Sequence, residues 1–274
     1  MTTTTKEKTK IDDPTTIGVF KPTKDEPVLE GHFLRIYSIY DTISGEMGGK
    51  IAQGDHVVFL RLQVCPLRCP WCDSKDTWSK KGGADISFET ICDQIMMKHC
   101  NKLIITGGEP LYQQGPALQK LIDWCGRNRI TVQIETAGSI LPQLNGVDCF
   151  VVDYKLKGSK QTNKMLPIHD YLRFGASAIL KFVIADEDDF KQAIEVRQKI
   201  IDSKQSGGHP GHIPKFAFSP VTETLSPLQL LGWLRESKIM NYSLNIQLHK
   251  RIGAKEDDPT KKPKKKKKTV EKSK

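Results

Sequence analysis

The sequence predicts an α/β fold: a partial (β/α) barrel of about six parallel strands, formed by residues 28–252 as one domain. Two observations support this. Short apolar segments alternate with segments of helical spacing, which is typical of βαβ units and a parallel sheet. In addition, the residues able to do chemistry follow the strand-like segments directly, and functional groups of such barrels collect at the carboxyl ends of the strands.

The strand-like segments are short and apolar, and several are rich in β-branched residues. They cover residues 57–63, 102–106, 130–135, 149–153, 178–184, 215–218 and 243–248. Helical spacing runs through residues 87–99, 115–128 and 187–204. A further helix is expected to begin at Ser226-Pro227, which supplies a cap and a proline at the first helical position. The glycine and proline content of residues 205–214 predicts a loop.

Both ends of the chain differ in composition from this domain. Residues 1–27 and 253–274 are polar and aperiodic and are predicted to be disordered extensions, the second rich in lysine. The net charge of +10 comes mainly from residues 253–274, which carry +6, while the domain carries about +4. The lysine run at 264–268 could contact nucleic acid or another anionic surface, although a solvated tail is the simpler interpretation.

No part of the sequence predicts a membrane protein or a secreted one. Its apolar runs are all shorter than the ~20 residues of a membrane-spanning helix. The first residues are polar and lack the apolar block of a signal peptide. We therefore expect a cytoplasmic location and no membrane partner.

The seven cysteines fall into two groups. Cys92, Cys100, Cys125 and Cys149 are scattered through apolar segments and are interpreted as small buried hydrophobes. The other three lie within eight residues, at positions 65, 69 and 72. An odd total without a secretion signal argues against a disulfide framework.

The clustered cysteines, Cys65, Cys69 and Cys72, favour an iron–sulfur cluster. Because most clusters take four thiolates, three would leave one iron open to a substrate or cofactor, which points to catalysis. A zinc site is the alternative, with His209 and His212 as candidate further ligands. Their spacing is not that of a typical zinc ligand pair, so the cluster is preferred.

The C-x3-C-x2-C spacing, with Trp71 before the last cysteine, resembles the radical S-adenosylmethionine superfamily. The glycine-rich segment Thr106-Gly107-Gly108-Glu109-Pro110 extends this resemblance. It implies a 4Fe–4S cluster held by the three cysteines and a bound S-adenosylmethionine. The residues implied to contact the cofactor are Trp71, Gly107, Gly108, Glu109, Glu135, Asp153, Tyr154 and Lys155.

Over residues 34–252 the chain resembles one family of this superfamily, the 7-carboxy-7-deazaguanine synthases of the queuosine pathway. The matching segments are IYSIYDTISGEMGG, VVFLRLQVCPLRCPWCDS, ITGGEP, IETAGS, LKFVIAD and LNIQLHK. The substrate-binding residues implied are Ser44, Gly45, Glu46, Arg61, Thr106 and His249, with Ser74 as a ligand of Mg²⁺. A carboxylate suits the aminopyrimidinone edge of a pterin, and an arginine fork suits its carboxylate.

The chain departs from the family pattern at a few places. Ser44 stands where the family has glutamine, and Ser74 where it usually has threonine. Asp153-Tyr154 replaces the Ser-Pro before Lys155, and the chain continues for 25 residues after His249. Structural roles also stay open for Arg61 in an ion pair, for Glu135 as a solvated carboxylate and for His249 at the barrel end.

The resemblance implies a carbon–nitrogen lyase that converts 6-carboxy-5,6,7,8-tetrahydropterin to 7-carboxy-7-deazaguanine with loss of ammonia. It further implies Mg²⁺, a flavodoxin or ferredoxin as reductant, and a homodimer. Two alternatives remain. One is a radical activase of a glycyl-radical enzyme, and the other is a zinc-containing nucleic-acid-binding protein that uses the lysine-rich tail.

Overall fold

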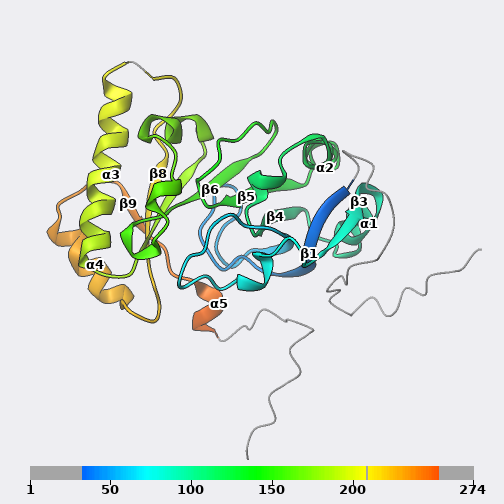
Figure 1. Cartoon of the computed structure of the whole chain (residues 1–274), viewed down its shortest axis with the longest axis horizontal. Coiled ribbons are helices and arrows are strands. Elements are labelled where there is room, and N and C mark those ends of the chain that lie inside the picture. Colours follow the sequence, from blue (N-terminus) through cyan, green and yellow to red (C-terminus); the bar gives the residue numbers. More distant parts are fainter. Residues whose placement is uncertain (1–32, 208, 253–274) are drawn as a thin grey trace, which may run out of the picture.

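One nine-stranded sheet organises the protein, in the order β3-β1-β2-β4-β5-β6-β7-β8-β9 (Figure 1). The computed structural model describes residues 33–207 and 209–252, so both predicted extensions lie outside the described residues. The strands are β1 (Phe33–Ile43), β2 (His56–Leu62), β3 (Ala84–Ser87), β4 (Lys102–Gly107), β5 (Thr131–Thr136), β6 (Cys149–Tyr154), β7 (Ile179–Ile184), β8 (Lys215–Pro220) and β9 (Tyr242–Leu244).

The predicted fold class is confirmed, and the seven strand-like segments of the sequence correspond to the seven parallel strands β2 and β4–β9. From β2 to β9 every neighbouring pair in the sheet is parallel. At one edge β1 pairs antiparallel with both β2 and β3. Neither of these edge strands is among those predicted.

Helices lie on the outer face of the sheet, α1 and α2 near one end and α3 and α4 near the other (Figure 1). They are α1 (Phe88–Met97), α2 (Pro116–Arg127), α3 (Glu187–Gln205) and α4 (Pro227–Glu236), whereas the short α5 (Leu248–Arg251) lies apart from them, after the last strand. Five 3-10 turns complete the fold: Lys75–Thr77, Pro110–Gln113, Lys157–Ser159, Thr162–Lys164 and Ile168–Phe174. Ser87, Asp186 and Ser226 cap α1, α3 and α4 through their side-chain oxygens, as such residues commonly do.

The main hydrophobic core lies between the outer face of the sheet and these helices. On β7, for example, Leu180, Phe182 and Ile184 are each at most 1% exposed and belong to this core. Because successive side chains of a strand point to opposite faces, Lys181 and Val183 face the other way. The inner face therefore carries a different set of residues from the outer one.

The segment between β1 and β2 joins the two ends of the domain. The Leu248 amide donates to the Gly45 carbonyl oxygen over 2.8 Å, and the Met47 amide donates to Asn245 Oδ1 over 2.9 Å. For this reason the predicted last strand is wrong in its second half. The sheet pairing ends at Leu244, and the chain then runs alongside the β1–β2 segment into α5.

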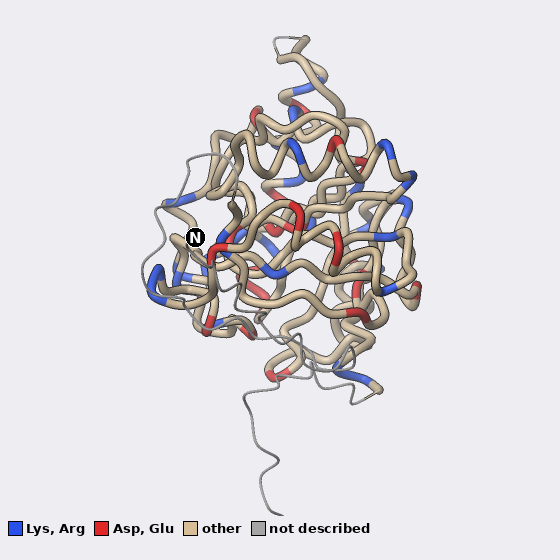
Figure 2. Tube along the Cα trace, turned by 90° about the vertical axis from the view of Figure 1, so that its right-hand side faces the viewer, with Lys and Arg blue, Asp and Glu red and all other residues tan. Residues whose placement is uncertain are grey.

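Charge is mixed over the body of the protein. Figure 2 shows lysine and arginine interspersed with aspartate and glutamate along the described trace. None of the described helices is long and apolar enough to cross a membrane. The charged residues that matter for chemistry are instead those on the inner face of the sheet.

Candidate active site

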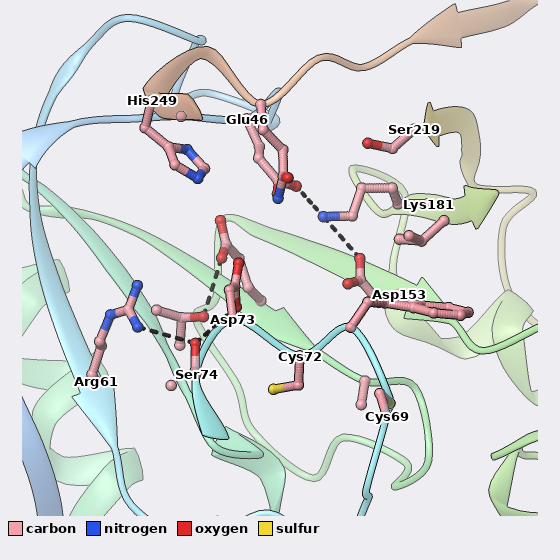
Figure 3. Close-up of a pocket in the computed structure, with 18 of the residues that line it drawn as sticks. Glu46, Arg61, Cys69, Cys72, Asp73, Ser74, Asp153, Lys181, Ser219 and His249 are labelled. Atoms are coloured by element: carbon pink, nitrogen blue, oxygen red, sulfur yellow. Dashed lines mark hydrogen bonds and ion pairs between the residues drawn. The ribbon is translucent and has the colours of Figure 1, made fainter. Parts of the chain in front are cut away.

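A pocket opens where the parallel strands end, on the inner face of the sheet (Figure 3). Successive strands each place a polar side chain in its wall. These are Arg61 from β2, Thr106 from β4, Glu135 from β5, Asp153 from β6, Lys181 from β7 and Ser219 from β8. Because the carboxyl ends of the parallel strands meet at one edge of the sheet, residues as much as 158 positions apart in the sequence lie in one pocket.

The cysteine loop forms one wall of this pocket. Cys65, Cys69 and Cys72 all line it, and all are free thiols. Burial raises the pKa of Cys65 to about 11 and also raises the pKa of Cys69, while the nearby positive charge of Lys155 lowers both. Burial thus favours the neutral thiols. A bound metal centre would supply the positive charge that stabilises the thiolates, because only the thiolate is a ligand.

The turn from β2 into this loop is strained. Val64 has a φ of 78°, which a β-branched residue rarely adopts. Two backbone hydrogen bonds hold it there: its amide donates to the Thr77 carbonyl oxygen, and its carbonyl oxygen accepts from the Glu109 amide. This backbone conformation turns the chain out of the strand and into the cysteine loop. A strained conformation of this kind persists only where surrounding contacts hold it in place.

The glycine-rich segment after β4 packs against the same turn. A Cβ on Gly107 would lie 2.4 Å from the Leu62 carbonyl oxygen, and one on Gly108 would lie 2.1 Å from that of Val64. Gly107 also has a φ of 110°. Only glycine fits both positions, so this segment can lie directly beside the cysteine loop.

Glu46 stands on the opposite side of the pocket. Its carboxylate forms an ion pair with Lys181, accepts from Gln247 Nε2 over 2.8 Å and lies 3.4 Å from Asn245 Nδ2. The His249 ring packs so closely on Gly45 that a Cβ there would lie 2.1 Å from Nδ1. Glu46 is thus fixed by residues from β7 and from the end of the domain.

Arg61 is 8% exposed and is oriented by neighbours on two sides. Its Nε donates to the Tyr40 hydroxyl over 2.9 Å, and Nη1 donates to Ser74 Oγ over 3.0 Å. Ser74 Oγ in turn donates to Asp73 Oδ1 over 3.0 Å. Arg61 therefore lies against the cysteine loop and lines the pocket, between the loop and β1.

Two carboxylates deeper in the pocket differ in charge. Burial, together with the negative charge of Glu46, raises the pKa of Glu135 to about 7, and Thr106 Oγ1 donates to this carboxylate over 3.1 Å. Burial would also raise the pKa of Asp153, but Lys155 and Lys181 hold it below its ordinary value. Asp153 is therefore the ionised partner of the two lysines, at 3.2 Å from Lys155 Nζ and 2.9 Å from Lys181 Nζ.

Three of the predicted site residues do not line the pocket. Ser44 is 1% exposed, and its hydroxyl donates to the Glu46 carbonyl oxygen. Glu109 is fully buried, and its carboxylate accepts from the Leu111 and Ala137 amides and from the Thr136 hydroxyl. Tyr154 lies on the outer face, where its ring packs on Tyr171 and Phe182.

The other predicted residues do line it. They are Gly45, Glu46, Arg61, Cys65, Cys69, Trp71, Cys72, Ser74, Thr106, Gly107, Gly108, Glu135, Asp153, Lys155 and His249. Sequence reasoning missed four polar residues at the site, Lys181, Ser219, Asn245 and Gln247. The available signal was a polar residue in the inward register of a strand-like segment, such as the lysine in ILKFVI.

Three of the other four cysteines are buried, as predicted. Cys92, Cys125 and Cys149 are 7%, 0% and 2% exposed, and Cys100 is partly buried. The zinc alternative finds no structural support in residues 33–207 and 209–252, because no three His, Cys, Asp or Glu side chains there are arranged around a single ion. A cluster makes a different demand, since each thiolate binds its own iron.

The chain is similar to known proteins in sequence and in fold. A protein-family model described as "4Fe-4S single cluster domain" matches residues 52–167. The 7-carboxy-7-deazaguanine synthase of Hyperthermus butylicus is 32% identical over 61% of this chain and 72% of its own length. That of Leptospira interrogans is 30% identical over 79% of this chain and 94% of its own length.

The fold has a counterpart among solved structures. The crystal structure of QueE from Escherichia coli aligns over 78% of this chain and 94% of its own, with a TM-score of 0.58 and 22% sequence identity. At that identity the structural match speaks for the fold, while the sequence matches speak for the family. The chain belongs to the 7-carboxy-7-deazaguanine synthase family.

Proposed function

We propose that this protein converts 6-carboxy-5,6,7,8-tetrahydropterin to 7-carboxy-7-deazaguanine, with loss of ammonia. The observation that carries the proposal is the pairing, in one pocket, of a three-cysteine loop with a largely buried carboxylate, Glu46, and a buried guanidinium, Arg61. A glycyl-radical activase would use the cysteines but has no need for Glu46 and Arg61 in these positions.

Glu46 and Arg61 are proposed to bind the two polar ends of the substrate. The Glu46 carboxylate accepts hydrogen bonds from the aminopyrimidinone edge, and the Arg61 guanidinium pairs with the substrate carboxylate. Thr106 and His249 also line the pocket and supply further polar contacts. Binding at both ends fixes the ring for reaction at a single carbon, which is how positioning accelerates a step.

The donor set of the cysteine loop fits a 4Fe–4S cluster, because three free thiols face one pocket and a lysine stabilises their ionised form. When bound, the cluster and S-adenosylmethionine supply the radical that removes a hydrogen atom from the substrate. Gly107 and Gly108 allow the cofactor to approach the backbone, and Trp71, Glu135, Asp153 and Lys155 are proposed to contact it.

We propose Ser74 as the protein ligand of Mg²⁺, with Asp73 beside it. Both oxygens lie at the pocket, 3.0 Å apart. Mg²⁺ prefers hard oxygen ligands and retains waters, so one or two protein oxygens plus substrate oxygens complete a suitable set. The hydroxyl of Ser74 provides the same donor atom as the family's threonine.

An external reductant, a flavodoxin or a ferredoxin, is proposed to bind the outer side of the cysteine loop. Cys65 lines both the pocket and a shallow outer depression beside Arg68, Lys75 and Lys80. The Arg68 guanidinium lies over the Trp78 ring at 5.1 Å. Basic and aromatic groups this close to a ligand cysteine suit an acidic electron donor. A homodimer is also proposed, and sedimentation of the holoenzyme tests it.

The function is tested by incubating anaerobically reconstituted protein with reductant, S-adenosylmethionine, Mg²⁺ and 6-carboxy-tetrahydropterin. We expect 7-carboxy-7-deazaguanine by mass spectrometry. The Glu46→Gln variant should lose substrate affinity, whereas Glu89→Gln, on the exposed surface of α1, should match the wild type. Accumulation of 5′-deoxyadenosine without any deazapurine would contradict the assignment.

A further inference from the structure

One lysine connects the two sides of the active-site pocket. Lys181 extends from the inner face of β7, and its ammonium group lies between the carboxylates of Glu46 and Asp153 (Figure 3). The residue is 5% exposed. Glu46 belongs to the proposed substrate wall and Asp153 to the proposed cofactor wall, so Lys181 contacts both walls at once.

These contacts form a row of alternating charges. Glu46 pairs with Lys181, Lys181 with Asp153, and Asp153 with Lys155. The last lysine lines the same pocket as Cys65 and Cys69. The row therefore runs from the substrate wall toward the cysteine loop, and each charge in it is followed by a charge of the opposite sign.

Glu46 needs such a cation. An ionised carboxylate is costly to bury unless it is paired and hydrogen-bonded, and it otherwise takes up a proton. Two further carboxyl groups, Glu135 and Asp153, line the same pocket as Glu46. Asn245 and Gln247 orient the carboxylate as neutral donors, but they add no charge. Protonated, Glu46 could no longer accept two hydrogen bonds from a pterin.

We propose that Lys181 is a positioning residue that holds Glu46 ionised and oriented toward the substrate, with Asp153 as its second anchor. The inference rests on the proposed function, because the pterin edge is what Glu46 is held for. It differs from a purely structural role in one respect: the effect of Lys181 must pass through the carboxylate of Glu46 to substrate affinity.

The test measures binding as well as turnover. In anaerobically reconstituted protein with S-adenosylmethionine, the Kd of 6-carboxypterin, a fluorescent analogue, is measured for Lys181→Met and Lys181→Arg. We expect Lys181→Met to raise Kd, and KM for the substrate, by at least about tenfold, as the loss of one partner of a buried charge pair does. The rate at saturating substrate should change less, and Lys181→Arg should recover part of the affinity.

The pH dependence separates positioning from folding. The groups around Lys181 are Glu46 from the β1–β2 segment, Glu135 from β5, Asp153 and Lys155 from β6, and His249 beside Gly45 from α5. Without the lysine these carboxylates retain protons to higher pH. The Kd of Lys181→Met should therefore fall as pH rises from about 6 to about 9, more steeply than in the wild type.

A double-mutant cycle shows whether the effect passes through Glu46. In a Glu46→Gln background, Lys181→Met should add little, because the two residues act as a unit. The matched control is Lys102→Met, which removes a strand lysine that pairs with Asp55 outside the pocket. It should bind the analogue like the wild type.

Two results overturn the inference. One is an unchanged Kd in Lys181→Met, and the other is a loss that is equal at every pH and fully additive with Glu46→Gln. Either result leaves the proposed function intact if wild-type protein binds the analogue and forms product. A wild-type protein that does neither contradicts the proposed function, and with it the inference.

Discussion

The two faces of the parallel sheet are built from the same strands but serve different ends. On β7, Leu180, Phe182 and Ile184 point into the core beneath the helices, while Lys181 points into the pocket and pairs with Glu46 and Asp153. The outer face is apolar and closely packed, and the inner face at the strand ends is charged. Substitutions of residues on the outer face should therefore lower the free energy of unfolding, and substitutions of residues on the inner face should change binding and activity.

The sharpest contrast is between two cysteines. Cys69→Ser should abolish iron content, visible absorbance and activity, because it removes a proposed cluster ligand at the pocket. Cys125→Ser, on the helix side of the core, should keep the cluster and lower the free energy of unfolding by about 1–3 kcal/mol. Iron analysis and urea unfolding measure both. Loss of the cluster in Cys125→Ser would break the comparison.

Neighbouring positions on β7 give the next contrast. Phe182→Ala should lower the free energy of unfolding by about 3–5 kcal/mol, because the fully buried ring packs on Tyr154, Phe216 and Phe218. Val183→Ala, one residue on and facing inward, should cost about 1 kcal/mol, since this side chain is only half-buried. Equal losses in urea unfolding would contradict the assignment of the two faces.

The cysteine loop has an inner and an outer side of its own. Reversing charge on the outer side, with Lys75→Glu and Lys80→Glu together, should raise KM for reduced flavodoxin by about tenfold. Turnover with a small chemical reductant should not change, because the pocket is untouched. The same reversal at Lys191 and Lys199 on α3 is the control. An unaltered KM for flavodoxin would place the docking surface elsewhere.

The smallest effect concerns Glu135. Burial raises its pKa from an ordinary carboxyl value to about 7, so the folded protein holds a proton there that the unfolded chain has lost. The free energy of unfolding should therefore fall as pH rises from about 4.5 to about 7 because of this group. Glu135→Gln should flatten that fall in urea unfolding of the cluster-free protein. An unchanged pH profile would contradict the raised pKa.

Most of the parallel sheet could be predicted because alternation and strand-end chemistry are local signals. The cysteine loop could be predicted because its three thiols lie within eight residues. The edge strands β1 and β3 were harder, since their pairing is antiparallel and joins segments about 50 residues apart. A βαβ pattern joins parallel strands, so it does not predict antiparallel strands such as these.

The remaining site residues depend on contacts that are distant in sequence. The Glu109 carboxylate accepts hydrogen bonds from Thr136 and Ala137, which lie at the end of β5. Its role therefore depends on where β5 ends and cannot be inferred from the glycine-rich motif alone. Tyr154 could have been excluded by strict alternation, since it follows the inward-facing Asp153. Lys181 could have been included by the same rule, as a lone cation in the inward register of an apolar strand.

The contacts of Glu46 also bear on the order in which the enzyme becomes competent. Gln247, which donates to its carboxylate, lies 201 residues further along the chain, whereas the cysteine loop and the glycine segment are about 40 residues apart. During synthesis the cluster wall can be assembled from an early part of the chain, but the substrate wall exists only after the end of the domain has joined it. Loop-closure entropy makes such long-range contacts late in folding. A truncated or unfinished chain would thus hold the parts for radical initiation without the site that directs the radical.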